Sequence, residues 1–345
     1  MRWLRAGGLM VGLLLLVMSL QQLEWAQAWD ALQAASLYAV PALALWHLGV
    51  VLIDAYAWRA LCPHALAVAP AVAWRWIAES VNTLLPVAQI GGDVVRARLW
   101  HRAGHPAQAA ALVVGLDVLA TALAQLPFAL LGVFLYAEFV PTANSWHLPD
   151  INFDVGFGIS ADVWVGVLAL VGGLLALSAA GVVLWRVRRP EIAPNWIRCS
   201  KTQQSLHSFA LACTRLMSQL LAQVKSVGWR RFAHSSALHF IGWVAGAVEI
   251  WLGLRLLGFP VSFVTALMFE SLLQTARSFA FLIPAGVGVQ EVTMLALANV
   301  FGVPVTAMLA LALLKRGREA LLSVPGMCAL LVMEWHYRRA RPDNS

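Results

Sequence analysis

Charged side chains are scarce in this sequence. Asp, Glu, Lys and Arg make up 12% of the 345 residues, hydrophobic residues make up 61%, and the mean hydropathy is +0.74. Soluble domains have about 25% charged residues, so this composition excludes a water-soluble core and predicts a polytopic membrane protein. The net charge of +7 does not indicate nucleic-acid binding, because the basic residues gather in loops beside apolar runs, where they orient membrane spans.

Cysteines and catalytic motifs are also scarce. The four cysteines form no CxxC pair and have no zinc-site spacing, which argues against a disulfide framework and against a metal site. The sequence has no HExxH, Walker or GxSxG motif. We therefore expect no catalytic residue, no metal and no cofactor, and the sequence does not predict an enzyme.

Helix-breaking and acidic residues recur in two halves of the chain. Each of the five matching pairs is separated by 198 residues, which indicates a duplicated unit. The pairs are Pro86 and Pro284, Asp93 and Glu291, Gly104 and Gly302, Pro106 and Pro304, and Pro127 and Pro325. With small gaps the repeat extends upstream, where His47 matches His239, Asp54 matches Glu249 and Glu79 matches Glu270.

The charge bias of the loops predicts the orientation of the spans. The segment 136–162 carries acids and no Lys or Arg, whereas 186–231 is strongly basic, so the first is expected outside and the second in the cytoplasm. Corresponding spans of the two halves then cross the membrane in opposite directions, as in the inverted repeats of secondary transporters. Both termini are predicted on the cytoplasmic side of a bacterial inner membrane. Whether residues 1–28 are an uncleaved anchor or a cleaved signal stays open.

These patterns predict an all-α polytopic membrane protein with two inverted repeats, each containing a re-entrant hairpin of broken helices. The predicted segments are an N-terminal anchor span with an external loop (1–35), the first repeat (36–135, hairpin 72–101), an external loop with a linking span (136–185), a basic cytoplasmic loop with an amphipathic helix (186–231), the second repeat (232–335, hairpin 263–302) and a basic cytoplasmic tail (336–345).

The hairpins carry the first group of candidate functional residues. Each is broken at a Pro and Gly cluster, which membranes tolerate only inside protein or beside a watered cavity. The second short helix of each hairpin begins near Gly92 or Val289, and its positive end suits an anion. Charges at this depth are costly and are interpreted as functional by default. The candidate gating or coupling residues are Glu79, Asn82, Pro86, Gly91, Gly92, Asp93, Glu270, Pro284, Gly286, Gly288 and Glu291.

The last span carries the densest charges, Lys315, Arg316, Arg318 and Glu319. Lys315 lies roughly 17 Å along the helix from Pro304, about half-way through a ~30 Å hydrocarbon core. The excess of positive charge suits a lipid phosphate. The candidate substrate-binding residues are Arg96, Arg277, Lys315, Arg316 and Arg318. The alternative is internal ion pairing, with Asp117, the repeat equivalent of Lys315, and Glu319 as structural partners. His47 and His239 are expected to pack between helices rather than to bind metal.

A family resemblance rests on both hairpins. The residues Asn82, Pro86, the run 91–93 and Arg96, together with PAGVGVQE at 284–291, resemble the flippase-like membrane domain of lysyl-phosphatidylglycerol synthases and their stand-alone relatives. The resemblance covers about residues 7–335. Many relatives have Glu in place of Asp93, and the soluble aminoacyl-transferase domain of the synthases is not expected here. The hairpin sequence at 79–99 most resembles the stand-alone branch associated with hopanoid biosynthesis.

The resemblance implies movement of a phospholipid or hopanoid-type lipid between leaflets or onward. Two alternatives stay open: an ion-coupled transporter of a small anionic solute, with Glu79, Asp93, Glu270 and Glu291 as coupling acids, and a non-catalytic scaffold of a lipid-biosynthesis complex. Expected partners are the cargo lipid and anionic inner-leaflet lipid at the amphipathic helix of 186–231. No nucleic acid is expected, and homo-oligomerisation is left open.

The orientation can be tested directly. Because segments 136–162 and 186–231 have opposite charge bias, reporter tags inserted in them should be accessible from opposite sides of the membrane. Accessibility of both tags from one side would contradict the inverted repeat.

Overall fold

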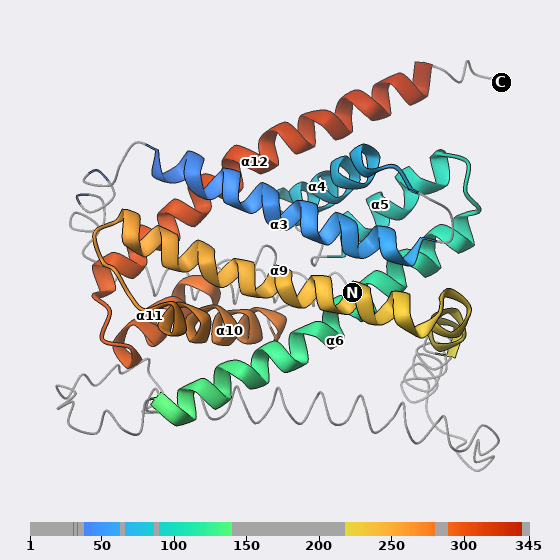
Figure 1. The fold of residues 1–345 in the computed structure, drawn as a ribbon. Coiled ribbons are helices and arrows are strands. Elements are labelled where there is room, and N and C mark those ends of the chain that lie inside the picture. Colours follow the sequence, from blue (N-terminus) through green and yellow to red (C-terminus); the bar gives the residue numbers. More distant parts are fainter. Residues whose placement is uncertain are drawn as a thin grey trace, which may run out of the picture.

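The computed structural model describes residues 30, 33, 38–62, 66–85, 90–139, 218–279 and 289–339, and its named elements are all helices (Figure 1). They are α3 (Ala39–Leu61), α4 (Val68–Leu84), α5 (Gly91–Arg102), α6 (Ala107–Phe139), α9 (Trp229–Leu256), α10 (Phe263–Phe279), α11 (Val289–Val300) and α12 (Val305–Arg339). The expected anchor span, the linking span and most of the basic loop lie outside the described residues.

Within the part of the chain that the structure describes, four helices are long and apolar enough to cross a membrane: Ala39–Leu61, Ala107–Tyr136, Trp229–Leu256 and Val305–Tyr337. In α6 apolar residues occur around the whole helix rather than along one stripe, which is typical of a helix surrounded by lipid and protein. The chain is therefore an all-α, multi-pass membrane protein, as the composition predicts.

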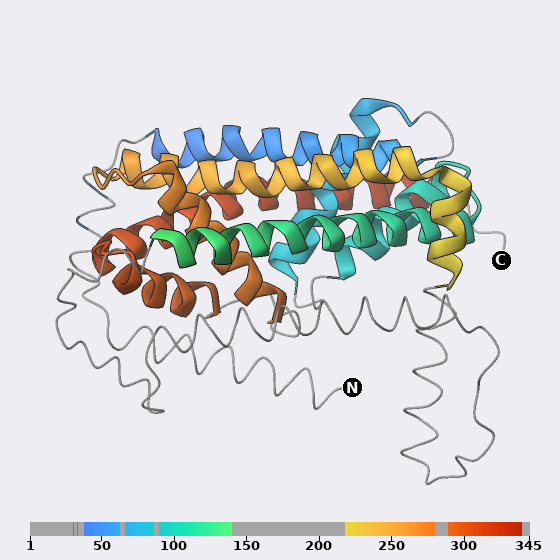
Figure 2. The same cartoon turned by 60° about the horizontal axis from the view of Figure 1, so that its bottom comes forward.

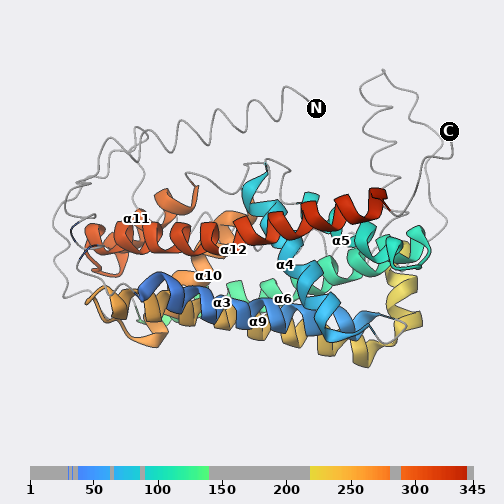
Figure 3. The same ribbon diagram turned by 90° about the horizontal axis from the view of Figure 1, so that it is seen from above.

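The helices of the two halves correspond in order and run in opposite directions. Helix α3 is antiparallel to α9, and α6 is antiparallel to α12, as Figures 1 and 3 show. The contacts are also paired: α6 packs on α9 as α12 packs on α3, and α10 packs on α6 as α4 packs on α12. Figure 2 shows α9 lying between α3 and α6. This arrangement is the inverted repeat that the sequence indicates.

The constant spacing of Gly and Pro has a structural cause. Gly104 and Gly302 follow the short helices α5 and α11 with φ of 100° and 64°, a left-handed conformation that other residues rarely adopt. Pro106 and Pro304 then precede the long helices, and each carbonyl accepts the first helical hydrogen bond, from Ala110 and from Met308. Each pair of residues thus ends a short helix and begins a long one.

The two legs of the first hairpin lie side by side because of Gly92 and Asn82. A Cβ atom on Gly92 would overlap the carbonyl oxygen of Ala78 in α4. The backbone N–H of Gly92 donates to Oδ1 of Asn82 at 2.8 Å, which satisfies one free donor at the start of α5. Gly91 and Gly92 belong to the Pro and Gly cluster that was expected to break this hairpin. Instead, they lie within α5 and neither has positive φ, so Gly92 is needed for close helix packing.

The tips of both hairpins lie outside the described residues. Pro86, Pro284, Gly286 and Gly288 belong to these tips, so their predicted roles stay predictions. Glu291 is in α11, but its side chain is not described. The described legs do form two corresponding pairs, α4 with α5 and α10 with α11.

The close approach at Gly92 predicts a stability effect. Gly92→Ala should destabilise the protein by about 1–3 kcal/mol, because the new methyl group forces α5 away from α4. Gly49→Ala is the matched control, since nothing lies within 4 Å of a Cβ at that position in α3, and it should stabilise slightly by helix propensity. Thermal unfolding of the purified variants measures both. Equal midpoints for Gly92→Ala and the wild type would contradict the packing argument.

Candidate functional site

A cavity of about 510 Å³ lies between the two repeats. Side chains from α3, α4, α5, α6, α9, α10 and α12 line it. The sequence-predicted residues that line it are Glu79, Asn82, Asp93, Arg96, Asp117, Glu270, Arg277, Lys315, Arg316, Arg318 and Glu319. Four further ionisable residues of the lining, His47, Asp54, Arg75 and Glu249, are absent from the predicted set. The intramembrane acids of the upstream repeat were the signal that could have found Asp54 and Glu249.

One chain of hydrogen-bonded charges joins α3, α4, α5, α6 and α9. Its members, in order, are Arg75, Asp54, His239, Asp117, Arg96 and Asp93. The two ring nitrogens of His239 face one oxygen of Asp54 at 3.0 Å and one oxygen of Asp117 at 2.9 Å. The second oxygen of each aspartate accepts from an arginine, Arg75 at 2.7 Å and Arg96 at 2.6 Å.

A second chain joins α3, α4, α9 and α12. Arg318 donates to one oxygen of Glu249 at 2.9 Å, and the other oxygen of Glu249 lies 3.1 Å from Nδ1 of His47. Nε2 of His47 lies 2.6 Å from Oε1 of Glu79. Four charged or titratable groups from four helices therefore meet in one line along the cavity wall.

The two chains share one motif. In each, the histidine of one repeat contacts the acid of the other repeat, His239 with Asp54 and His47 with Glu249, and an arginine holds the second oxygen of that acid. These four residues are repeat equivalents. The histidines are thus bridges between charged groups, a role beyond the helix packing expected of them. Among the described residues no group of His, Cys, Asp or Glu is arranged to hold a metal ion.

Lys315 forms an ion pair with a residue of its own repeat. Its ammonium group lies 3.5 Å from Glu270 of α10, and the other oxygen of that glutamate accepts from Gln274 at 2.6 Å. Gly246 of α9 leaves room for this carboxylate, since a Cβ there would lie 2.9 Å from it. The alternative salt bridge between Lys315 and Asp117 is therefore wrong, because Asp117 is already held by Arg96 and His239.

The excess positive charge expected of α12 is largely neutralised. Arg316 donates to Glu319 at 2.8 Å on the same helix, and Arg318 and Lys315 pair with acids from neighbouring helices. Arg277 differs, since it lines the cavity and forms no ion pair with any residue that the structure describes. Its cavity neighbours on α6 and α10 include the uncharged Gln125, Gln274 and Ser278.

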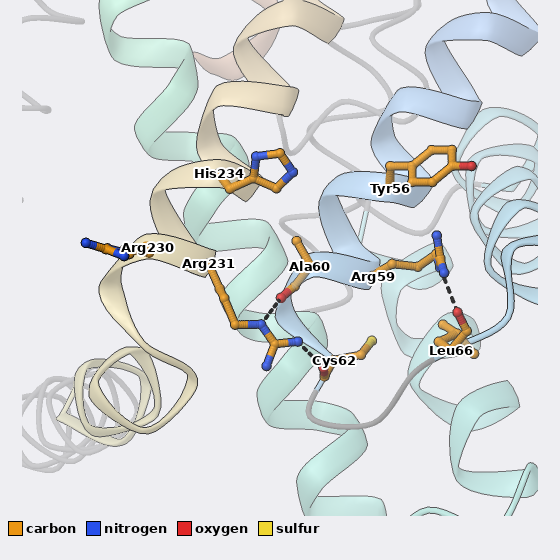
Figure 4. Close-up of a pocket in the computed structure, with 8 residues that line it drawn as sticks. All are labelled: Tyr56, Arg59, Ala60, Cys62, Leu66, Arg230, Arg231 and His234. Atoms are coloured by element: carbon orange, nitrogen blue, oxygen red, sulfur yellow. Dashed lines mark hydrogen bonds between the residues drawn. The ribbon is translucent and has the colours of Figure 1, made fainter.

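A second cavity, of about 440 Å³, lies where α3 ends and α9 begins (Figure 4). Its lining residues are Tyr56, Arg59, Ala60, Cys62, Leu66, Arg230, Arg231 and His234. Arg231 donates to the carbonyl oxygens of Ala60 at 2.9 Å and Cys62 at 2.7 Å, so it caps the C-terminal end of α3. The lining contains three arginines and no acid.

Comparison with known families identifies the chain. The model of the lysylphosphatidylglycerol synthase TM region matches residues 5–326. The chain belongs to the lysylphosphatidylglycerol synthase TM region family. No curated protein and no solved structure matches it. Membership in the lysylphosphatidylglycerol synthase TM region family indicates a membrane-lipid-related function, in agreement with the resemblance carried by the two hairpins.

The pairing of Lys315 predicts a pattern of stabilities. Either Lys315→Ala or Glu270→Ala alone should destabilise by about 3–5 kcal/mol, because each leaves a buried charge without its partner. The Lys315→Ala/Glu270→Ala double variant should recover much of this loss, whereas Lys315→Ala/Asp117→Ala should not. Unfolding of the five proteins in detergent tests the pairing. If stability recovered only in the Lys315→Ala/Asp117→Ala variant, the partner of Lys315 would be Asp117 and not Glu270.

Proposed function

We propose that the protein is a translocase that moves a membrane lipid with an anionic headgroup between leaflets or onward. The observation that carries this proposal is a polar cavity between inverted repeats in a bundle whose long helices expose many large hydrophobic side chains. A lipid headgroup crossing the membrane needs such a path, because polar groups are costly in hydrocarbon. Secondary transporters place their substrate sites at the same position between repeats.

Arg277 is the leading candidate for contact with the headgroup. The buried cations of the cavity are committed to acids: Arg96 to two aspartates, Lys315 to Glu270 and Arg318 to Glu249. Arg277 faces the same space without an ion pair among the described residues. A guanidinium can bind a phosphate with two parallel hydrogen bonds. We assign Arg277 as the primary contact and the half-buried Arg316 as a second one, while Arg96, Lys315 and Arg318 fix the cavity walls.

The two hairpins are proposed as the gates. Their described legs supply Glu79, Asn82 and Asp93 from the first hairpin and Glu270 from the second to the cavity lining. Asn82 and Asp93 have local roles there, since Asn82 caps α5 and Asp93 pairs with Arg96 three residues later. Gating by Pro86, Gly91, Pro284, Gly286, Gly288 and Glu291 stays part of the proposal.

The proposal also covers the membrane in which the protein lies, the lipid at its surface and the cargo. The charge bias supports a bacterial inner membrane with cytoplasmic termini. The arginine-lined second cavity supports binding of anionic inner-leaflet lipid near the predicted amphipathic helix. Phospholipid suits the cationic Arg277 better than an uncharged hopanoid does. We propose no catalytic step.

A small anionic solute is the second candidate cargo. Arg277 would bind a free phosphate or carboxylate by the same hydrogen bonds that a lipid phosphate uses. Mass spectrometry of molecules that copurify with the protein separates the two, because a lipid carrier should retain phospholipid that Arg277→Gln loses.

Translocation tests the role of Arg277. In liposomes containing fluorescent NBD-phosphatidylglycerol, the wild type should increase the rate at which inner-leaflet probe reaches the outer leaflet, where external dithionite reduces it. Arg277→Gln should lower this rate about tenfold or more, as expected for one lost charge-assisted hydrogen bond of 1.5–3 kcal/mol.

Arg255→Gln is the matched control, because Arg255 is exposed at the end of α9 and lies over the Trp251 ring, away from the cavity lining. It should translocate at the wild-type rate. A wild-type rate no greater than that of protein-free liposomes would refute the proposed function for this probe, and equal losses in both variants would remove Arg277 from the site.

A further inference from the structure

His47 and His239 each face two carboxylates, one at each ring nitrogen. An ionised carboxylate can only accept hydrogen bonds, so a ring nitrogen facing one must carry a proton. Both nitrogens are protonated only in the imidazolium form. The geometry therefore requires that each histidine hold an extra proton, unless one of its two carboxylates is itself protonated.

For His239, neither of the two carboxylate partners is the protonated group. Asp54 and Asp117 each accept a hydrogen bond from an arginine through the second oxygen, and arginine stays charged in proteins. Both aspartates are thereby held ionised. The side chain of His239 is 1% exposed, so water has little access to its protons. This bridge is a static structural one.

The bridge of His47 is different at one end. Glu249 is held by Arg318, but the carboxylate of Glu79 has no arginine or lysine within ion-pair distance among the described residues. Glu79 is also the most exposed member, with 31% of its side chain accessible from the cavity. A proton shared between Nε2 of His47 and Oε1 of Glu79, 2.6 Å apart, can therefore reach cavity water.

Charge balance also requires a proton on His47, as it does on His239, whose chain has three aspartates and two arginines. The chain of Arg318, Glu249, His47 and Glu79 has two acids and one arginine, so it is neutral only when His47 is protonated. The charged groups that the described neighbouring elements present are Glu249 on α9, Glu79 on α4 with Arg75 held by Asp54, and Arg318 on α12. Lys315 of α12 also acts on Glu249, but its own charge is balanced by Glu270. On α6, Asp117 belongs to the other chain.

We propose that His47 and Glu79 form a proton-exchange site that couples cargo movement to proton movement. In the exchange, Nε2 of His47 gives its proton to Oε1 of Glu79, which releases it to water in the cavity. The Nε2 lone pair of the neutral imidazole then faces the ionised carboxylate of Glu79, so this hydrogen bond between α3 and α4 is lost. Because α4 is the first leg of a proposed gate, this step links proton release to gate movement. The coupling rests on the proposed function, whereas proton exchange itself does not.

The first experiment observes the protons without any cargo. Histidine labelled with ¹⁵N is followed by solid-state NMR in phosphatidylcholine liposomes from pH 6 to pH 10, with His47→Gln and His239→Gln assigning the signals. We expect His239 to stay imidazolium throughout and His47 to change to the neutral ring within this range. In Glu79→Gln, His47 should already be neutral at pH 7, because one of its two anionic partners is gone. A His47 that stays in one form throughout, or that titrates together with His239, overturns the exchange site.

The second experiment tests the coupling. With NBD-phosphatidylglycerol, the wild-type translocation rate should differ at least fivefold between pH 6 and pH 9, and Glu79→Gln should remove this dependence. Glu138→Gln, at an exposed position near the end of α6, is the control and should retain it. A wild-type rate equal at both pH values overturns the coupling. If the wild type moves no probe at all, the proposed function fails for this lipid, while the NMR titration still decides whether the exchange site exists.

Discussion

The cost of an unpaired charge inside a membrane constrains this structure more than any other factor. Moving an ion out of water costs several kcal/mol even after relaxation, and the described helices bury arginines, a lysine and carboxylates at positions where apolar residues would insert more readily. The observed solution is two chains of alternating charge that run through neighbouring helices. In this packing the buried arginines, the lysine and the buried carboxylates have partners of opposite charge.

Because of the inverted repeat, the same pairing of a histidine with an acid occurs twice in the structure. Two antiparallel copies place His47 opposite Glu249 and His239 opposite Asp54, so each repeat neutralises an acid of the other. The copies are not identical beyond that contact. Position 117 is an acid where position 315 is a lysine, and one bridge ends in an arginine-held aspartate while the other ends in Glu79 beside the cavity. This difference leaves the Asp117 end of one bridge buried and the Glu79 end of the other partly exposed to the cavity.

Small residues make this packing feasible. Gly246 makes space for the Glu270 carboxylate, Gly92 brings α5 against α4, and a Cβ on Gly132 or Gly326 would overlap Ser271 or Ser80 at equivalent helix crossings. Close approach of helices brings side chains of ordinary length within hydrogen-bond distance of one another. Glycine in membrane helices commonly serves such approach, and here it also determines which charges can meet.

The sequence by itself determined the class, the repeat, and the points at which α5 and α11 end and α6 and α12 begin. Scarce charge and long apolar runs are sufficient to predict a membrane protein. The repeat is visible because both copies keep a glycine with positive φ two residues before a proline, Gly104 with Pro106 and Gly302 with Pro304. Most of the charged residues of the cavity lining could also be named, because a charge in an apolar span is conspicuous. The ion-pair partners of these residues could not be predicted. Lys315 was compared with Asp117, its repeat equivalent, whereas its partner is Glu270, and both histidines were interpreted as packing residues. Their contacts join residues 185 and 202 positions apart. Only the crossing of the helices decides which side chains meet at that separation, and no local pattern in the sequence records it.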